Sequence, residues 1–236
     1  MTAMVRLACA ALCVALLLAG APARADDLAD FNAAVEATMV HRRALDRHLR
    51  NGDRDDAMLE LDGMRAAWSK VATLPRPTAF KSTERYTETM LDISARMVGM
   101  VLVLNLGRPD VARETLDAIR DALSRLRREN GVRVLADCIA DAGIDMAALA
   151  ELGEKPNFEN GAIAAIAQSY GASLRRCDTM ADAATRASAE FRRPVDGALA
   201  SLARLPETIK ARDPDALRRL LIELRAFGEA LAARYG

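Results

Sequence analysis

Apolar residues recur every three or four positions along most of this chain, which is the spacing that gathers side chains on one face of an α-helix. Ala, Leu and Arg are abundant, and all three favour helix, whereas aromatic residues make up only 4% of the chain. The longest regular run lies between residues 83 and 105, and its apolar positions are Tyr86, Met90, Ile93, Met97, Met100, Val101 and Leu104. The pattern predicts an all-α fold.

The helical stretches are separated by short turns. Asn51-Gly52 ends the first stretch, Leu106-Gly107 ends the third, and a loop with Pro75 and Pro77 follows the second. Short turns make consecutive helices antiparallel, so we expect an antiparallel up-and-down helix bundle, built as two packed bundle-like halves. The first helices are expected over residues 27–50, 53–71, 83–105 and 109–128.

The chain divides into segments of different character. They are a signal peptide (1–25), an N-terminal four-helix bundle (26–131), an irregular connector with short helices (132–160) and C-terminal helical hairpins (161–236). The connector is expected to be irregular because it contains Gly143, Gly153 and Pro156. In the last segment, Pro194 is expected to interrupt or kink a long helix.

The first 25 residues have the parts of a secretory signal peptide. Arg6 supplies a positive charge, residues 7–18 are an apolar run too short to span a bilayer, and Ala23-Arg24-Ala25 is a small-x-small cleavage site. No later stretch reaches the ~18 consecutive apolar residues of a membrane span. We expect a periplasmic protein that begins at Asp26 after cleavage and has no membrane span.

Removal of the signal peptide takes away Arg6 and Arg24 and leaves 31 basic against 33 acidic residues, a net charge of −2. The two signs are interleaved, as on ordinary solvated helix faces. This composition lacks the basic footprint of a nucleic-acid-binding protein, so no nucleic-acid partner is expected.

Two of the four cysteines, Cys9 and Cys13, lie in the predicted signal peptide. The remaining pair, Cys138 and Cys177, is predicted to form a disulfide, because an even pair in an exported protein usually does. A metal-binding thiol pair and two free thiols are the alternatives, and no Cys-x-x-Cys spacing supports either of them.

Several stretches share the order of a known bundle family. Asp26-Asp27-Leu28 opens a helix, Asn51-Gly52-Asp53 forms a turn, and Met64-Arg65-Ala66-Ala67 precedes a proline loop. A further stretch runs from Asn105-Leu106-Gly107-Arg108-Pro109-Asp110 to Cys138. Together they resemble the small periplasmic four-helix-bundle cytochromes, that is, the c-prime class and its soluble b-type relatives. The resemblance covers about residues 26–138, with a fainter echo over 162–236.

The haem chemistry of that family does not carry over. Covalent attachment needs Cys-x-x-Cys-His, whereas this chain has Leu135-Ala136-Asp137-Cys138-Ile139, with one cysteine missing and Ile139 in place of the histidine. Phe31 and Asn32 stand where the b-type relatives have a methionine ligand. The resemblance therefore implies a haem-free scaffold with no cofactor, and haem or copper bound without covalent attachment is the alternative.

The candidate metal ligands are Met39, His41 and His48. His41 and His48 are the only histidines, and together with methionines they could bind copper or a non-covalent haem. Because ligands seven residues apart lie ~10 Å apart along a helix axis, they cannot chelate one ion, and solvated histidines are the alternative. The acidic stretch Asn51–Asp56 lacks the EF-hand pattern and is predicted to be a capped helix start.

No catalytic constellation is recognisable in the chain, which has neither a Gly-x-Ser-x-Gly elbow nor a phosphate-binding Gly-rich loop. Our first hypothesis is a non-catalytic periplasmic binding or interaction protein, whose partner is an unknown periplasmic protein or a small ligand. The second is an electron-transfer or storage protein that binds haem or copper through His41 and methionines. An enzyme with an unrecognised site is the third.

Overall fold

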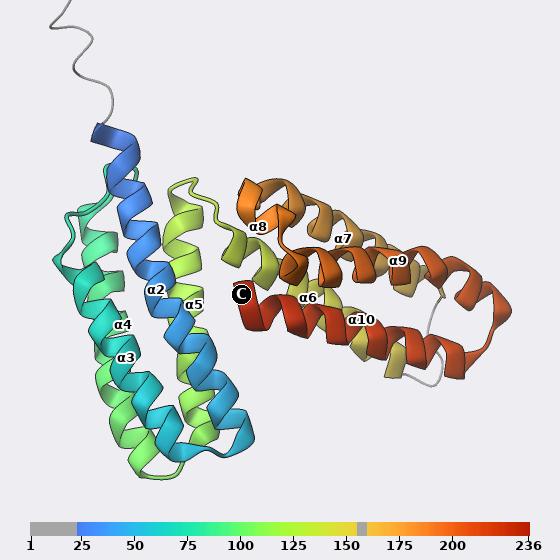
Figure 1. Ribbon diagram of the computed structural model, residues 1–236, viewed down its shortest axis with the longest axis horizontal. Helices are drawn as coiled ribbons and strands as arrows, with labels where there is room; N and C mark the ends of the chain where they lie inside the picture. Colours follow the sequence, from blue (N-terminus) through green and yellow to red (C-terminus); the bar gives the residue numbers. More distant parts are fainter. Residues whose placement is uncertain (1–22, 155–159) are drawn as a thin grey trace, which may run out of the picture. The chain divides into compact units, whose positions relative to one another are not determined.

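The computed structural model describes residues 23–154 and 160–236, and all the regular structure within those ranges is α-helical (Figure 1). The predicted all-α fold class is therefore confirmed. The predicted signal peptide lies outside the described residues except for positions 23–25. The chain forms two compact units, unit 1 up to Val132 and unit 2 from Arg133 to Gly236.

Unit 1 contains four long helices joined by short connections. They are α2 (Ala23–Asn51), α3 (Arg54–Thr73), α4 (Thr83–Asn105) and α5 (Pro109–Glu129). Each helix packs against the next, and α5 packs back against α2, so the four enclose a common core (Figure 1). Gly52 and Gly107 have φ values of +79° and +68°, which only glycine adopts without strain, and they close the α2–α3 and α4–α5 turns.

The core of unit 1 follows the apolar stripes of its helices. Phe31, Leu61 and Met64 are fully buried, and the predicted α4 stripe is buried at Met90, Met97 and Met100. These methionines are packed side chains that fill the interior. The Trp68 ring is 4% exposed, and its Nε1 donates to Ser94 Oγ at 2.9 Å, which joins α3 to α4.

Asp46 is a half-buried carboxylate that links α2 to α5. It accepts hydrogen bonds from Arg50 Nη2 at 2.6 Å and from Arg113 Nε at 3.1 Å. Partial burial by itself would raise the pKa of Asp46, but the hydrogen bonds from Arg50 and Arg113 outweigh it and hold the pKa below the ordinary value.

A carboxylate with a lowered pKa in the folded state stabilises that state above its unfolded pKa, and the stabilisation is lost as the pH falls through the folded pKa. We therefore expect unit 1 to lose stability as the pH falls below about 4, the ordinary Asp value. Denaturant melts followed by Trp68 fluorescence measure this. Asp46→Asn should flatten the acid dependence, whereas Asp62→Asn, at an exposed i,i+3 pair with Arg65, should leave it unchanged. Equal effects of the two variants would contradict the assignment.

Unit 2, like unit 1, contains four long helices that pack around a common interior, and it has one short helix in addition. Its helices are α6 (Leu135–Glu154), α7 (Asn160–Met180), α8 (Ala183–Ala187), α9 (Ala189–Ala211) and α10 (Pro214–Tyr235). Helix α6 packs against α7 and α10, and α9 packs against the same two helices. The interior between them holds Met146, Leu149, Tyr170, Leu174, Phe191, Val195 and Leu224.

The prediction of an irregular connector over residues 132–160 was wrong for most of that range. Residues 135–154 form the single helix α6, in place of two short helices. The reason is packing: Ile139, Ala142 and Met146 return every three or four residues and bury one face, which outweighs the cost of an interior Gly143. The part around Pro156 lies outside the described residues.

The helix boundary in this region does not lie at Pro194, where the sequence predicted an interruption or a kink. Helix α7 ends at Met180, and α9 runs through both Pro194 and Pro206. Side-chain caps set the starts of the next two helices. Asp182 caps α8 by accepting from the backbone N–H groups of Ala184 and Thr185, and Ser188 caps α9 by accepting from that of Phe191. Capping therefore decides the boundaries in this region, and the prolines lie within a helix.

Candidate metal site

The turn between α2 and α3 brings a histidine and two aspartates together. The chain reverses at Gly52, and the backbone N–H of Asp53 donates to the carbonyl of His48 at 2.9 Å. Asp53 is the N-cap residue of α3, but its side chain makes no capping hydrogen bond. Its carboxylate lies next to His48 on the last turn of α2, as does that of Asp56 one turn further along α3.

The distances within this group are those of ligands around a shared ion. His48 Nδ1 lies 3.7 Å from Asp53 Oδ2 and 3.8 Å from Asp56 Oδ2, and the donor atoms of the three residues all lie within 4.8 Å of one another. Such separations are too long for hydrogen bonds. Two ligands that each bind Zn²⁺ at ~2.1 Å in tetrahedral or wider geometry lie roughly 3.4–3.7 Å apart. The two separations from His48 lie at the upper end of this range or just beyond it, so a bound divalent ion would draw the three side chains slightly together.

His48 Nδ1 is itself a buried nitrogen without a hydrogen-bond partner among the described residues. An unpaired buried nitrogen is unfavourable, and a bound cation would satisfy it. The side chains of Asp53 and Asp56 are 49% and 65% exposed, so an ion has access from solvent.

The donor set selects a class of ion. One imidazole nitrogen and two carboxylate oxygens suit first-row divalent ions such as Zn²⁺ and Cu²⁺. Ca²⁺ takes six to eight oxygen ligands, which this group does not offer.

Three arginines near this turn are engaged away from the donor group. Arg50 binds Asp46, and Arg43 binds Glu36. Arg54, at the start of α3, donates to Asn105 Oδ1 at 3.2 Å. Because these guanidinium groups are engaged elsewhere, the carboxylates of Asp53 and Asp56 determine the local charge.

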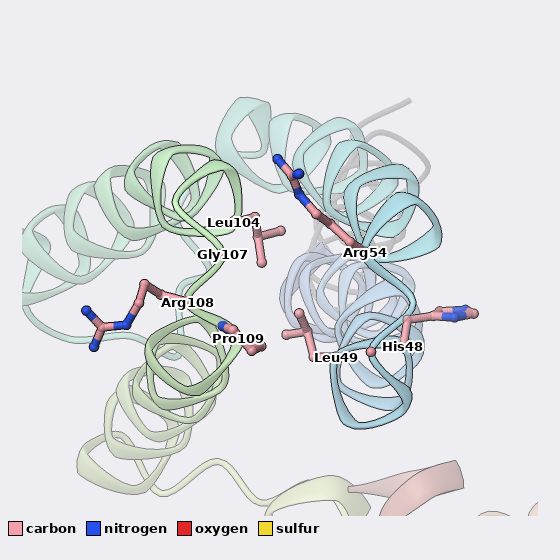
Figure 2. A pocket seen from close by; sticks show the side chains of 8 residues that line it. His48, Leu49, Arg54, Leu104, Gly107, Arg108 and Pro109 are labelled. Atoms are coloured by element: carbon pink, nitrogen blue, oxygen red, sulfur yellow. The ribbon is translucent and has the colours of Figure 1, made fainter.

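A small apolar recess lies on the other side of His48. It has a volume of about 190 Å³ and is lined by Leu49, Leu104 and Pro109, with Arg54 and Arg108 at its edge. Figure 2 shows the His48 ring pointing away from the recess. His48 thus contributes both to the lining of the recess and to the group of three donor residues, which lie at the same end of unit 1.

His41 and Met39, the other predicted ligands, have different surroundings. His41 Nδ1 lies 2.7 Å from Glu60 Oε2, and its ring covers Gly63, where an added Cβ would come within 2.6 Å. Met39 is buried in the core, with 5% of its surface exposed. Because an offset of two positions turns a helix by roughly 200°, the side chains of Met39 and His41 leave α2 on opposite sides. The structure does not bring Met39, His41 and His48 together.

Sequence analysis missed Asp53 and Asp56, which it assigned to a capped helix start. The available signal was a histidine, His48, four residues before Gly52, together with the acidic residues that follow Gly52. Only the turn geometry shows that these side chains face His48.

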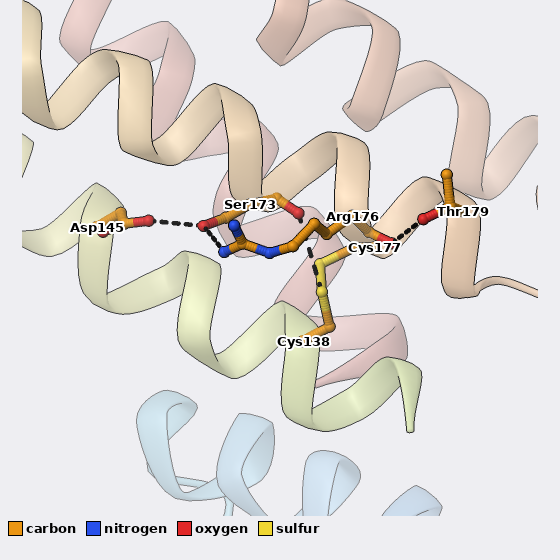
Figure 3. Close-up of a disulfide and its surroundings, with 6 residues drawn as sticks. All are labelled: Cys138, Asp145, Ser173, Arg176, Cys177 and Thr179. Carbon is orange, nitrogen blue, oxygen red and sulfur yellow. Dashed lines mark hydrogen bonds between the residues drawn. A yellow bond between two sulfur atoms is a disulfide. The ribbon is translucent and has the colours of Figure 1, made fainter. Parts of the chain in front are cut away.

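Cys138 on α6 and Cys177 on α7 form the predicted disulfide (Figure 3). Their Sγ atoms lie 2.19 Å apart and their Cα atoms 5.5 Å apart. The bond joins two adjacent helices, because residue 138, which lies in the range predicted as an irregular connector, belongs to α6. Because its sulfur is bound to Cys177, Cys138 does not fit a thioether link to haem.

Among the helices in the described ranges, none combines the length and apolar character that a bilayer span requires. Comparisons of the chain with protein-family models, with curated proteins and with solved structures found no match.

Proposed function

We propose that this chain is an exported, non-catalytic binding protein that holds a divalent transition-metal ion at His48, Asp53 and Asp56. The observation that supports this function is the convergence of two carboxylate oxygens on a buried imidazole nitrogen that has no hydrogen-bond partner among the described residues. The ion leaves further coordination positions open, which a partner protein or small ligand in the periplasm can occupy.

The scaffold we propose is a haem-free relative of the periplasmic four-helix-bundle cytochromes. The four successive helices of unit 1 support this proposal, as does the turn order on which the resemblance rests. A binding role is favoured over catalysis because, among the described residues, neither histidine has a serine, threonine or cysteine as a hydrogen-bond partner: His41 faces Glu60, and His48 faces the two aspartates. A histidine base would need such a nucleophile within hydrogen-bond reach.

Titration calorimetry with Zn²⁺ and Cu²⁺ tests the proposed site. His48→Gln and Asp56→Asn should each weaken metal binding by at least about 10–100-fold. Loss of a residue that only hydrogen-bonds to a metal ligand already has an effect of that size, and these two residues are proposed as ligands themselves. Asp55→Asn is the matched control, because Asp55 is an exposed neighbour that is not part of the group. His41→Ala should bind as the parent does. Loss of binding in His41→Ala but not in His48→Gln would favour the alternative copper or haem site.

Metal should also stabilise unit 1. At a free Zn²⁺ concentration of 100 times Kd, linkage predicts a gain of about 2.7 kcal/mol, visible as a higher melting temperature by Trp68 fluorescence. Mg²⁺ and Ca²⁺ should have little effect. A protein that gains no stability from Zn²⁺ or Cu²⁺ does not have the proposed function.

A further inference from the structure

A groove runs along unit 2 between α6 and α10. It has a volume of about 410 Å³, which lies within the range of sites for small organic ligands. Its lining is Gly143, Met146, Ala147, Ala150 and Glu151 from α6 and Arg225, Gly228, Glu229 and Ala232 from α10. The groove belongs to a different unit from the proposed metal site and shares no residue with it.

The groove exists because the facing positions of the two helices are small. Gly143 lies inside α6, where glycine weakens a helix relative to alanine. A Cβ at Gly143 would meet nothing within 4 Å, so packing within the unit does not require glycine there. Close approach of a bound molecule is one use for such a position.

Tyr170 of α7 places an unsatisfied hydroxyl at the wall of this groove. Its side chain is 1% exposed, and its OH has no hydrogen-bond partner among the described residues. The hydroxyl oxygen lies 3.2 Å from the Cβ position of Gly228, and Met146 Cγ lies 3.5 Å from the same point. Because Gly228 and Met146 both line the groove, the hydroxyl lies directly behind them.

The surroundings keep this hydroxyl protonated and available as a donor. Burial, together with the nearby Asp145 carboxylate, raises the pKa of Tyr170 to about 12. Asp145 is not a hydrogen-bond partner of the Tyr170 hydroxyl, which has none among the described residues. The two Asp145 oxygens accept from Ser169 at 3.1 Å and from Ser173 at 2.8 Å. Figure 3 shows the Asp145–Ser173 bond between α6 and α7. The Tyr170 hydroxyl therefore lacks a hydrogen-bond acceptor, which the oxygen of a bound molecule could supply.

The charges at the groove disfavour an anion, and its largely apolar lining disfavours burial of a cation. Arg225 Nε donates to Glu229 Oε1 at 2.9 Å, so this arginine is neutralised by its partner on the same helix. Glu151 and Glu229 outnumber the single arginine, which disfavours a carboxylate or phosphate.

We propose that the α6–α10 groove binds a small, neutral, largely apolar molecule whose acceptor oxygen receives the Tyr170 hydroxyl hydrogen bond. The lining of glycine and alanine holds the apolar body by close contact. Met146, whose unbranched side chain adapts readily, is the residue that moves to let the acceptor reach the hydroxyl.

Two probe molecules of nearly the same shape test the proposal. 2-Acetylnaphthalene carries a carbonyl oxygen, and 2-isopropenylnaphthalene carries a CH₂ group in its place. The protein should bind the acetyl compound about tenfold more tightly, the effect of one buried hydrogen bond. Tyr170→Phe should abolish the preference while its melting temperature stays the same or rises, because an unsatisfied buried hydroxyl is removed. Tyr235→Phe, in the same unit, should keep the preference.

Gly143→Leu should block both probes, because its side chain would occupy the groove, and a Cβ at position 143 would meet nothing within 4 Å. Circular dichroism checks that this variant remains helical. The proposal is overturned if the parent protein binds neither probe, or if Tyr170→Phe retains the preference for the acetyl compound. Failure here leaves the metal titrations unaffected, because the two sites share no residue.

Discussion

Removing the Cys138–Cys177 disulfide is expected to lower the free energy of unfolding of unit 2 by about 3–4 kcal/mol. The bond closes a loop with a sequence separation of 39 residues. In the chain-entropy model, a closed loop of that length reduces the conformational freedom of the unfolded chain by an amount of this size. It is a large effect, because whole domains are stable by only about 5–15 kcal/mol.

The double variant Cys138→Ala and Cys177→Ala makes the measurement. Alanine is preferred to serine because Cys177 is fully buried and a hydroxyl there would need a partner. Urea unfolding is followed by far-UV circular dichroism, which reports both units, and by Trp68 fluorescence, since this single tryptophan lies in unit 1. The dichroism transition should shift to lower urea while the Trp68 transition stays in place. An unchanged dichroism transition would show that the disulfide does not stabilise unit 2.

Leu61→Ala is the second change with a large expected effect. Leu61 lies on α3 and is 0% exposed, so its truncation removes buried apolar surface and leaves a cavity in unit 1. Leucine-to-alanine changes in such positions lower the free energy of unfolding by about 2–5 kcal/mol. The midpoint of the Trp68 fluorescence transition should fall accordingly.

Leu59→Ala is the matched control, with the same chemical change two residues away on the same helix. Leu59 is 69% exposed. Its replacement should alter stability by less than about 0.5 kcal/mol, as for ordinary surface substitutions. If both variants lost the same stability, the burial of α3 described for unit 1 would be incorrect.

The helical fold was largely predictable because its causes are local. The three- and four-residue spacing of Tyr86, Met90, Ile93 and Met97 specifies both a helix and its buried face. The turns at Gly52 and Gly107 were equally visible, because few other residues adopt their backbone conformation. The pairing of Cys138 with Cys177 followed from there being no other pair outside the predicted signal peptide.

Prediction failed where tertiary packing outweighs a local signal. Gly143 weakens a helix by itself, yet α6 continues through it because Ile139, Ala142 and Met146 bury a common face. Whether a glycine ends a helix therefore depends on energies that its neighbours in space supply. Pro194 is a different case: it was expected to interrupt or kink a long helix, but the boundary lies at Asp182 and Ser188, whose side chains cap new helices locally.

The sequence by itself determined that this chain is helical, which faces are buried and which cysteines pair, because apolar periodicity and turn residues act over a few positions. Only the tertiary structure decided what the polar side chains do. An aspartate at a helix start can cap its own helix or turn to a neighbouring one, and Asp53 turns to His48 because α2 lies beside it. Likewise, the apolar pattern buries Tyr170, but only the tertiary structure places its hydroxyl beside Gly228 of α10, without a hydrogen-bond partner and next to a groove.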